Sequence, residues 1–132
     1  MPLIATDTQR FSNVVKHEYE PSLAFCREVL TANEAGAKTY QVGTVLGKVT
    51  ATGKYKVSVQ SAADGSQNPV AVVIEDKSVA AATDTKVLAI VRGPALVSKA
   101  GLVLDASFDT DVKKAAAYAS LAAANILSND TV

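Results

Sequence analysis

The chain has 132 residues, the usual length of one domain, and its 13 lysines and arginines equal its 13 aspartates and glutamates. A formal net charge of zero does not favour a nucleic-acid partner, because proteins that bind nucleic acids usually carry a basic face. The same balance removes electrostatic repulsion between copies of the chain, so self-association is easier. No apolar run approaches the ~20 residues of a membrane helix, and no signal-peptide pattern opens the chain, so we expect no membrane partner.

Residues 1–20 differ from the rest of the chain because their apolar side chains are scattered and follow no period. Such a segment buries little surface, so ordering it costs more than local packing returns. A frayed terminus is the simplest interpretation. The alternative is an arm that orders on a partner by adding a strand to a sheet edge, and its extended residues would be Thr6, Thr8, Phe11, Val14 and Val15. We therefore divide the chain into an arm, 1–20, and a single β-rich domain, 21–132.

Short strands and turns are predicted before residue 40. Residues 14–20 fit a strand that ends before Pro21, since the residue before a proline avoids helical geometry. The apolar run at 23–30 fits a strand or a short helix, of which we favour the strand. Residues 33–38 contain turn-forming residues and are expected to form a turn.

The segment 43–59 predicts two strands joined by a tight turn at residues 51–54. Gly53 adopts a positive φ without steric cost, which suits that turn. Gly43 and Gly47 would weaken a flat strand, so they predict a bend, a bulge or a close approach of another backbone segment. The glycines do not form a phosphate-binding loop, because only three residues separate Gly43 from Gly47 and a valine follows Lys48.

The β pattern continues through the second half of the chain. Residues 61–69 form a polar loop, and the short apolar runs at 70–75 and 86–92 predict buried strands separated by a loop or one helical turn at 76–84. Pro94 ends or bends the second of these strands because it has no N–H to donate. The segments 95–98 and 101–105 also follow the β pattern.

A single helix is predicted near the end of the chain. Asp109 or Thr110 can cap it, and Asp111 lies in the first turn, where a negative charge is favourable. Its expected apolar face consists of Val112, Ala115, Ala119, Ala122, Ala123 and Ile126. Because this face is made mostly of alanine, the helix can pack closely against a sheet or against a neighbouring subunit. The sequence thus predicts a mainly β fold with a small α content and a C-terminal alanine-rich helix.

The sequence shows no motif for catalysis, for a metal or for a cofactor. His17 is the only histidine, and Cys26, the only cysteine, has no nearby base and cannot form an internal disulfide. The polar loop at 64–68 lacks the spacing and the final glutamate of a calcium-binding loop. We therefore expect no enzyme, no metal and no cofactor, and we favour a binding or structural role.

Several segments in order resemble the head decoration protein family of tailed phages, whose best-known member comes from phage lambda. They are Gly43–Lys48, Gly53–Tyr55, Asp64–Gln67 and Val91–Ala95, and the resemblance runs from about residue 19 to residue 127. It implies a β-rich, β-clip-like core and trimers at three-fold and quasi-three-fold positions on the outer surface of an expanded virion capsid. There the trimers hold phage major capsid proteins together against the pressure of packaged DNA. The family has no catalytic residue.

The resemblance also changes the interpretation of the first 20 residues. The arm of the family is mobile in the free protein and adds a strand to the capsid protein on docking. It is therefore the best candidate for the capsid contact, and the expected contact residues are Leu3, Ile4, Thr6, Thr8, Phe11 and Val14.

Two other functions remain as alternatives. Trimeric dUTPases share the β-clip theme, and residues 101–105 resemble the segment whose aspartate activates water in those enzymes. The tyrosine and the Arg-Gly pair expected soon after Asp105 are missing, and Arg92 begins a poor match to the phosphate-binding Arg-Ser-Gly. A different virion or adhesin module on a similar scaffold is the second alternative, since a fold does not determine a function.

Overall fold

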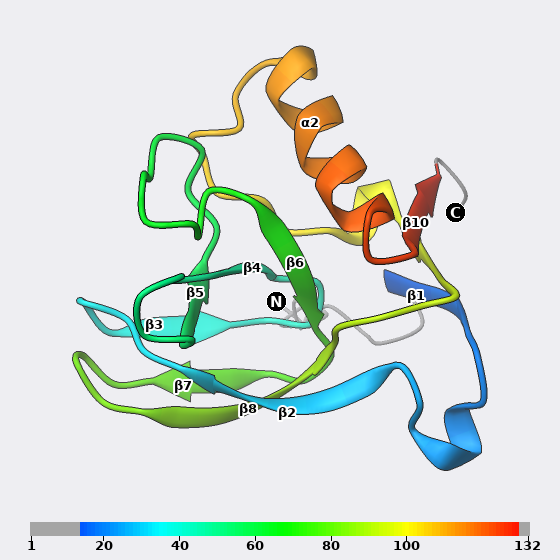
Figure 1. The fold of residues 1–132 in the computed structure, drawn as a ribbon, viewed down its shortest axis with the longest axis horizontal. Coiled ribbons are helices and arrows are strands. Elements are labelled where there is room, and N and C mark those ends of the chain that lie inside the picture. Colours follow the sequence, from blue (N-terminus) through cyan, green and yellow to red (C-terminus); the bar gives the residue numbers. More distant parts are fainter. Residues whose placement is uncertain (1–13, 130–132) are drawn as a thin grey trace, which may run out of the picture.

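The computed structural model describes residues 14–129 of the chain (Figure 1). This part is mainly β, as predicted, with one α-helix near its C-terminal end. The strands are β1 (Val15–Glu18), β2 (Arg27–Ala32), β3 (Lys38–Tyr40), β4 (Val45–Lys48), β5 (Tyr55–Val57), β6 (Pro69–Val73), β7 (Lys77–Val79), β8 (Thr85–Ile90), β9 (Ala95–Ser98) and β10 (Ile126–Asn129). The helices are the 3-10 turns η1 (Pro21–Leu23) and η2 (Lys99–Gly101) and the α-helix α2 (Asp111–Ala122).

Five strands close into a small barrel in the order β2-β5-β4-β6-β8. β2 pairs antiparallel with β8 from Arg27↔Ile90 to Ala32↔Thr85, and it meets β5 at Ala32↔Tyr55, which completes the ring. The predicted hairpin at 43–59 is confirmed as the antiparallel pair β4–β5. Closure leaves the barrel strands without a long free edge.

The glycines of the hairpin have the predicted roles. Gly53 adopts a φ of +71° in the turn between β4 and β5. A Cβ atom on Gly47 would overlap the backbone of Ser66, because the 58–68 loop crosses β4 at this point. Gly47 therefore marks the close backbone approach that its position in the strand predicted.

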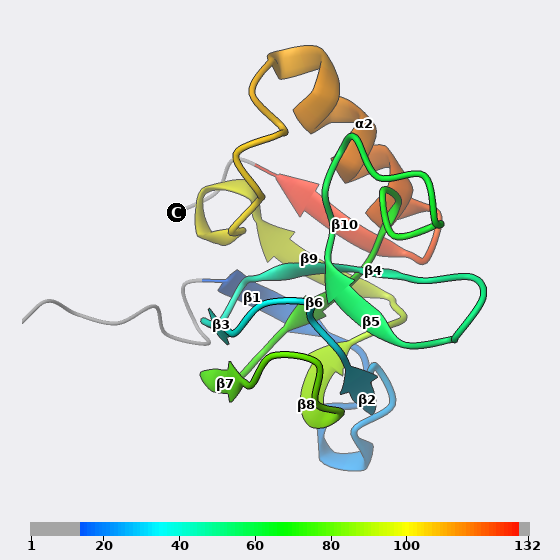
Figure 2. The ribbon, with the colours of Figure 1, turned by 90° about the vertical axis from the view of Figure 1, so that its left-hand side faces the viewer.

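A second sheet is open and has three strands in the order β1-β9-β10. Figure 2 shows the three strands side by side, with β9 in the middle. β1 pairs antiparallel with β9, and β10 pairs parallel with it. The strand predicted within 14–20 is thus confirmed, and its pairing places residues 15–18 in the folded body instead of the arm.

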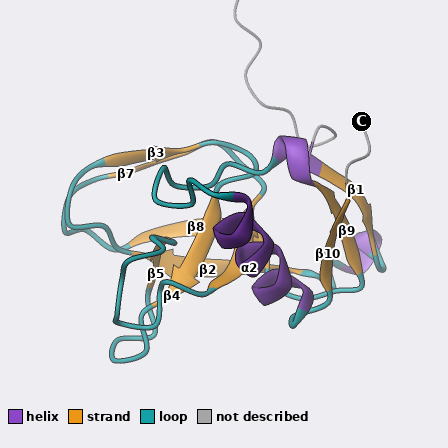
Figure 3. Ribbon diagram, turned by 90° about the horizontal axis from the view of Figure 1, so that it is seen from above, coloured by secondary structure: helices purple, strands orange, loops and turns teal. Residues whose placement is uncertain are grey.

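The helix α2 lies above the middle of the molecule, between the barrel and the open sheet (Figure 3). Its predicted cap is confirmed, since the Thr110 side chain accepts a hydrogen bond from the Lys113 N–H at 3.2 Å. The predicted apolar face is wrong: Ala117 and Leu121 are buried, whereas Val112 is 80% exposed. Seven alanines between residues 115 and 124 make the helix apolar on nearly every side, so periodicity could not select the face that the larger Leu121 anchors.

Three further segments differ from their prediction. Ile126, which we placed on the helix, begins β10, because the chain reverses at Asn125 with a φ of +63°. The turn at 33–38 and the loop at 76–84 contain parts of β3 and β7, which pair as a two-stranded ribbon. Each of these strands has three residues, and their pairing joins segments far apart in the sequence. No local pattern in the sequence therefore predicts them.

The apolar core has two parts. One fills the space between the open sheet, α2 and the barrel, and consists of Val14, Val15, Cys26, Val42, Val72, Ile74, Ile90, Ala95, Val97, Leu121 and Ile126. The other fills the barrel and the ribbon, and consists of Leu30, Ala32, Tyr40, Leu46, Ala71, Val73, Val79, Val87 and Ala89. Within residues 14–129, no helix has the length and apolar character needed to cross a membrane.

Candidate interaction surfaces

The residues predicted to contact the capsid divide into two groups. Leu3, Ile4, Thr6, Thr8 and Phe11 lie outside the described residues. Val14 is described and fully buried in the core, beside Gly43. Its side chain is therefore part of the core and is not exposed to a partner in this structure.

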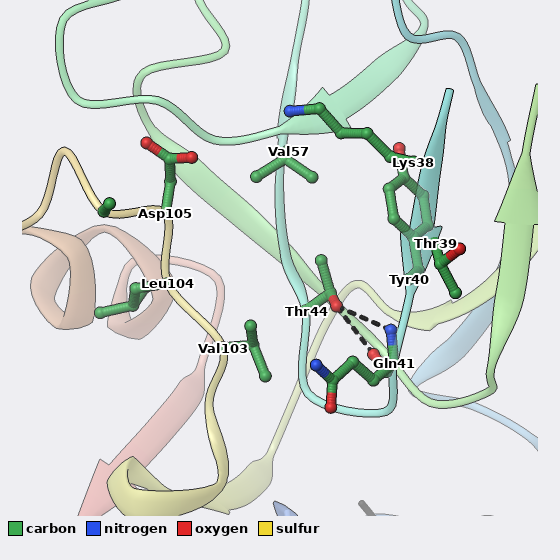
Figure 4. A pocket seen from close by; sticks show the side chains of 10 residues that line it. Lys38, Thr39, Tyr40, Gln41, Thr44, Val57, Val103, Leu104 and Asp105 are labelled. Atoms are coloured by element: carbon green, nitrogen blue, oxygen red, sulfur yellow. Dashed lines mark hydrogen bonds between the residues drawn. The ribbon is translucent and has the colours of Figure 1, made fainter. Parts of the chain in front are cut away.

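One hollow lies between β3, the turn at 41–44 and the segment 103–106 (Figure 4). It has a volume of about 340 Å³, and Lys38 and Asp105 reach it from opposite sides. The Thr44 hydroxyl donates to the Gln41 carbonyl oxygen at 2.8 Å and accepts from the Gln41 N–H at 3.1 Å, which holds the turn. The polar groups of this turn thus bond mainly to one another.

Asp105 is held in a structural role. Burial disfavours its charged form, but hydrogen bonds from Ser107 and the nearby charge of Lys38 outweigh this effect and keep the pKa of Asp105 below its ordinary value. Its carboxylate accepts the Ser107 N–H at 3.0 Å, which is the bond of an Asx turn. A carboxylate with a low pKa is a weak proton acceptor, so this site does not favour the general base of the dUTPase alternative.

Arg92 lies elsewhere and does not complete such a site. Its guanidinium donates to the Phe25 carbonyl oxygen at 2.5 Å and to the Glu28 carboxylate at 2.7 Å. Of the two arginines in the described residues, Arg27 and Arg92, neither lines the hollow of Asp105. The two segments that suggested a dUTPase are therefore not brought together.

Behind the hollow, the buried Glu34 connects the barrel to the β3–β7 ribbon. Its carboxylate accepts hydrogen bonds from the Tyr40 hydroxyl and, at 2.8 Å, from the Val57 N–H. Burial and the hydrogen bond to Glu34 raise the pKa of Tyr40 far above its ordinary value, so Tyr40 stays protonated. This cluster satisfies buried polar groups and stabilises the fold.

An apolar patch covers the loop between β1 and β2 and the outer side of β2. Four large apolar side chains form this "loop patch": Tyr19 (47% exposed), Leu23 (76%), Phe25 (45%) and Val29 (59%). Single exposed apolar side chains are common, but four from 11 consecutive residues are a feature of interaction surfaces. The sequence does not predict the patch, because the apolar run at 23–30 is interpreted as a strand, and a strand pattern does not say which of its side chains stay exposed.

The loop that carries the patch is tied firmly to the body. The Tyr19 N–H donates to the Pro94 carbonyl oxygen at 2.9 Å, and the Cys26 thiol, fully buried, reaches the same oxygen at 3.7 Å. The Tyr19 and Phe25 rings meet edge to face, with centroids 5.5 Å apart, and the Arg92 guanidinium lies 5.8 Å from the centre of the Phe25 ring. Glu20 and Ala24 adopt left-handed backbone conformations that non-glycine residues rarely use, so the loop holds one specific shape.

A second exposed apolar surface lies along α2 and β10. We call it the "helix face", and it consists of Val112, Ala115, Ala119, Ala122 and Leu127. Beside it are two open hollows of about 460 Å³ each, which meet at Lys99 and Tyr118. The Lys99 ammonium lies 5.0 Å from the centre of the Tyr118 ring.

The part of the chain that the structure describes holds no group of three or more histidine, cysteine, aspartate or glutamate side chains arranged to bind a metal ion. A scan against protein families matches residues 5–126 to the family model of bacteriophage lambda head decoration protein D. The chain belongs to this family. Searches of curated proteins and of solved structures found no match. The resemblance expected from the sequence is thus confirmed, and the chain is a phage head decoration protein, a component of the head with the capsid as its partner.

The family also bears on the question of an enzyme. It is a family of structural capsid proteins and not a known enzyme family. The geometry of the decoration protein agrees with this membership, because Asp105 and Arg92 each have structural partners at separate places.

Proposed function

We propose that this decoration protein binds as a homotrimer at three-fold and quasi-three-fold positions on the outside of an expanded phage head. There it joins neighbouring copies of the major capsid protein and stabilises the head against the internal pressure of DNA. The observation that carries the proposal is the family match, because it spans the folded body and most of the arm. The β-clip likeness of the core stays a prediction.

In this proposal residues 1–13 contact the capsid protein, and Leu3, Ile4, Thr6, Thr8 and Phe11 supply the side chains. Two features support it. Val14 anchors the start of the arm in the core, and β1, which follows, is an outer strand of the open sheet. An extended segment that leaves an edge strand is well placed to pair with a strand of another protein.

The binding of this protein would stabilise the expanded head through mass action. A protein that binds the expanded shell but not its unexpanded or broken forms shifts the equilibrium towards the expanded shell. A trimer carries three arms, and attachment through several linked contacts raises the overall affinity by ~10²–10⁴. No single arm then needs a strong contact.

The test mixes the purified protein with expanded, undecorated heads and images them by electron microscopy. We expect three-fold protrusions with the full chain, and a loss of at least about tenfold in bound protein when residues 2–13 are deleted. The deletion should leave the melting temperature and the oligomeric state unchanged. The Asp105→Asn variant is the matched control and should bind like the unmodified protein. The unmodified protein should release no pyrophosphate from dUTP. Heads that never acquire the full-length protein would contradict the proposal.

A further inference from the structure

We propose that the loop patch of one copy of this chain docks onto the helix face of the next copy, and that this contact closes the trimer. The inference rests on the trimer of the proposed function and deepens it by naming the two surfaces that meet. Neither surface includes residues 1–13, and neither is explained by the folding of a single chain.

The loop patch has the composition of an interface centre. Aromatic side chains and arginine are enriched where proteins meet, and the residues that contribute most to binding are often tyrosine and arginine. Here Tyr19 and Phe25 pack edge to face, Arg92 lies over the Phe25 ring, and Leu23 projects furthest into solvent at 76% exposure. Because the loop is already held by hydrogen bonds to Pro94, little ordering is needed when it binds.

The charges around the loop patch favour a second copy over a charged foreign surface. Arg27 pairs with Glu18 through contacts as short as 2.5 Å, and Arg92 pairs with Glu28 at 2.7 Å. Glu20, also exposed in this loop, adds one negative charge to the two pairs. Lys99 and Lys114, which line the hollows beside the helix face, offer the complementary positive charge on a second copy.

The position of the patch also separates it from the arm. Val14, the first residue that the structure describes, lies next to one end of β1, whereas the patch begins at Tyr19, beyond its other end. Strand geometry places these ends about 10 Å apart. The arm can therefore reach the capsid while the patch contacts a neighbouring subunit.

A cyclic trimer needs two different surfaces on each subunit that fit one another, because its contacts run head to tail. The helix face supplies the second surface. It offers small side chains, Ala119 and Ala122, beside a hollow of about 460 Å³ that Leu127 also lines. A hollow of this size, lined in part by small alanine side chains, admits projecting side chains such as Leu23 and Phe25. Figure 1 shows the β1–β2 loop and the β10 edge on the same, right-hand side of the molecule.

The first test is sedimentation of the Leu23→Glu variant. The unmodified chain should sediment at three times the 13.7 kDa mass of one chain. Burying the new carboxylate at a subunit contact is unfavourable. Leu23→Glu should therefore raise the protein concentration at which half of the trimer is dissociated by at least about tenfold. The matched control is Ala63→Glu, which adds the same charge to an exposed residue of the 58–68 loop and should remain a trimer. Far-UV circular dichroism should show both variants folded.

The second test joins the two surfaces directly. We expect the double variant Leu23→Cys/Ala119→Cys to form disulfide-linked species up to the trimer under mild oxidation. Each single variant should stay unlinked, since Cys26 is fully buried. Dimers of Leu23→Cys alone, or a Leu23→Glu variant that stays trimeric, would overturn the inference while leaving the proposed function intact. A monomeric unmodified chain would overturn both the inference and the proposed trimer. A trimer that behaves as expected here but never binds expanded heads would contradict only the capsid function.

Discussion

The barrel and the open sheet of this protein differ in whether their strand edges are paired and in how many large apolar side chains they expose. The barrel closes on itself through the β2–β5 and β2–β8 pairs, whereas the sheet β1-β9-β10 ends in two outer strands. Among the six large apolar side chains that the described residues expose, Val29 alone comes from a barrel strand. The others lie on α2, on β10 or in the loop that links β1 to the barrel.

The difference shows where a small structural protein can keep surfaces for association. A closed barrel satisfies its backbone groups internally and offers no strand edge to a partner. An open sheet keeps its edges, and the elements attached to it keep apolar side chains outside. Apart from Val29 of β2, the loop patch and the helix face lie on elements attached to the open sheet, so we assign contacts mainly to this part of the molecule.

The largest expected effect tests whether the two parts form one cooperative unit. Leu46 of the barrel and Leu121 of α2 are both fully buried. Truncating either to alanine should lower the free energy of unfolding by about 2–5 kcal/mol, measured by urea denaturation. Val72 and Ile90 belong to barrel strands but pack in the core of the open part, so both variants should unfold in a single transition. Two separate transitions would contradict a shared core, and the exposed Ser78→Ala should change stability by less than about 0.5 kcal/mol.

The second prediction concerns the close backbone contact on the barrel. Gly47→Ala places a methyl group against the backbone of Ser66, which cannot move aside as a side-chain tip can. We expect a loss of up to about 3 kcal/mol in the free energy of unfolding. Gly36→Ala is the matched control, because nothing lies within 4 Å of its added methyl group, and its stability should be unchanged or slightly higher. Equal effects of the two substitutions would mean that the barrel tolerates the methyl group.

A third prediction concerns the polar cluster that joins the barrel to its ribbon. Glu34→Gln removes the charge that accepts hydrogen bonds from the Tyr40 hydroxyl and the Val57 N–H. Both donors bond to the same carboxylate oxygen, so the amide oxygen of glutamine can keep both bonds but accepts them as a neutral group, and the variant should lose about 1 kcal/mol. Urea denaturation of the variant and of the unmodified protein measures this loss. If Glu34→Gln left the free energy of unfolding unchanged, apolar packing alone would join the barrel and the ribbon.

The smallest expected effect is a dependence on pH at the 58–68 loop. Hydrogen bonds from the Ser66 hydroxyl and the Ser66 N–H lower the pKa of Asp64 to about 2. Because its pKa is lower in the folded protein than in the unfolded chain, Asp64 stabilises the fold above about pH 4, and this contribution disappears as the pH falls towards 2. The melting temperature of Asp64→Asn should therefore approach that of the unmodified protein only below pH 4. Nuclear magnetic resonance titration should place the Asp64 midpoint near 2, and Ser66→Ala should raise it; a midpoint near 4 in the unmodified protein would contradict the prediction.

Much of the fold was predictable because its signals are local. The Thr110 cap, the Gly53 turn and the strands around the apolar runs at 70–75 and 86–92 each depend on residues within one short segment. The family resemblance was predictable for a similar reason, since it rests on the order of several short segments. The ribbon β3–β7 and the strand β10 were missed because they exist through pairing with distant residues.

The amino-acid sequence by itself determined that the chain is a mainly β decoration protein with a capped alanine-rich helix and no catalytic motif. Only the tertiary structure decided which side of that helix faces inward, and that Leu23 and Phe25 stay outside while Val14 is buried. The physical reason is that the residue type determines whether a side chain is apolar, whereas the exposure of that side chain depends on which distant elements cover it. An alanine-rich helix and an apolar loop each fit several arrangements, and the closure of the barrel selected one of them.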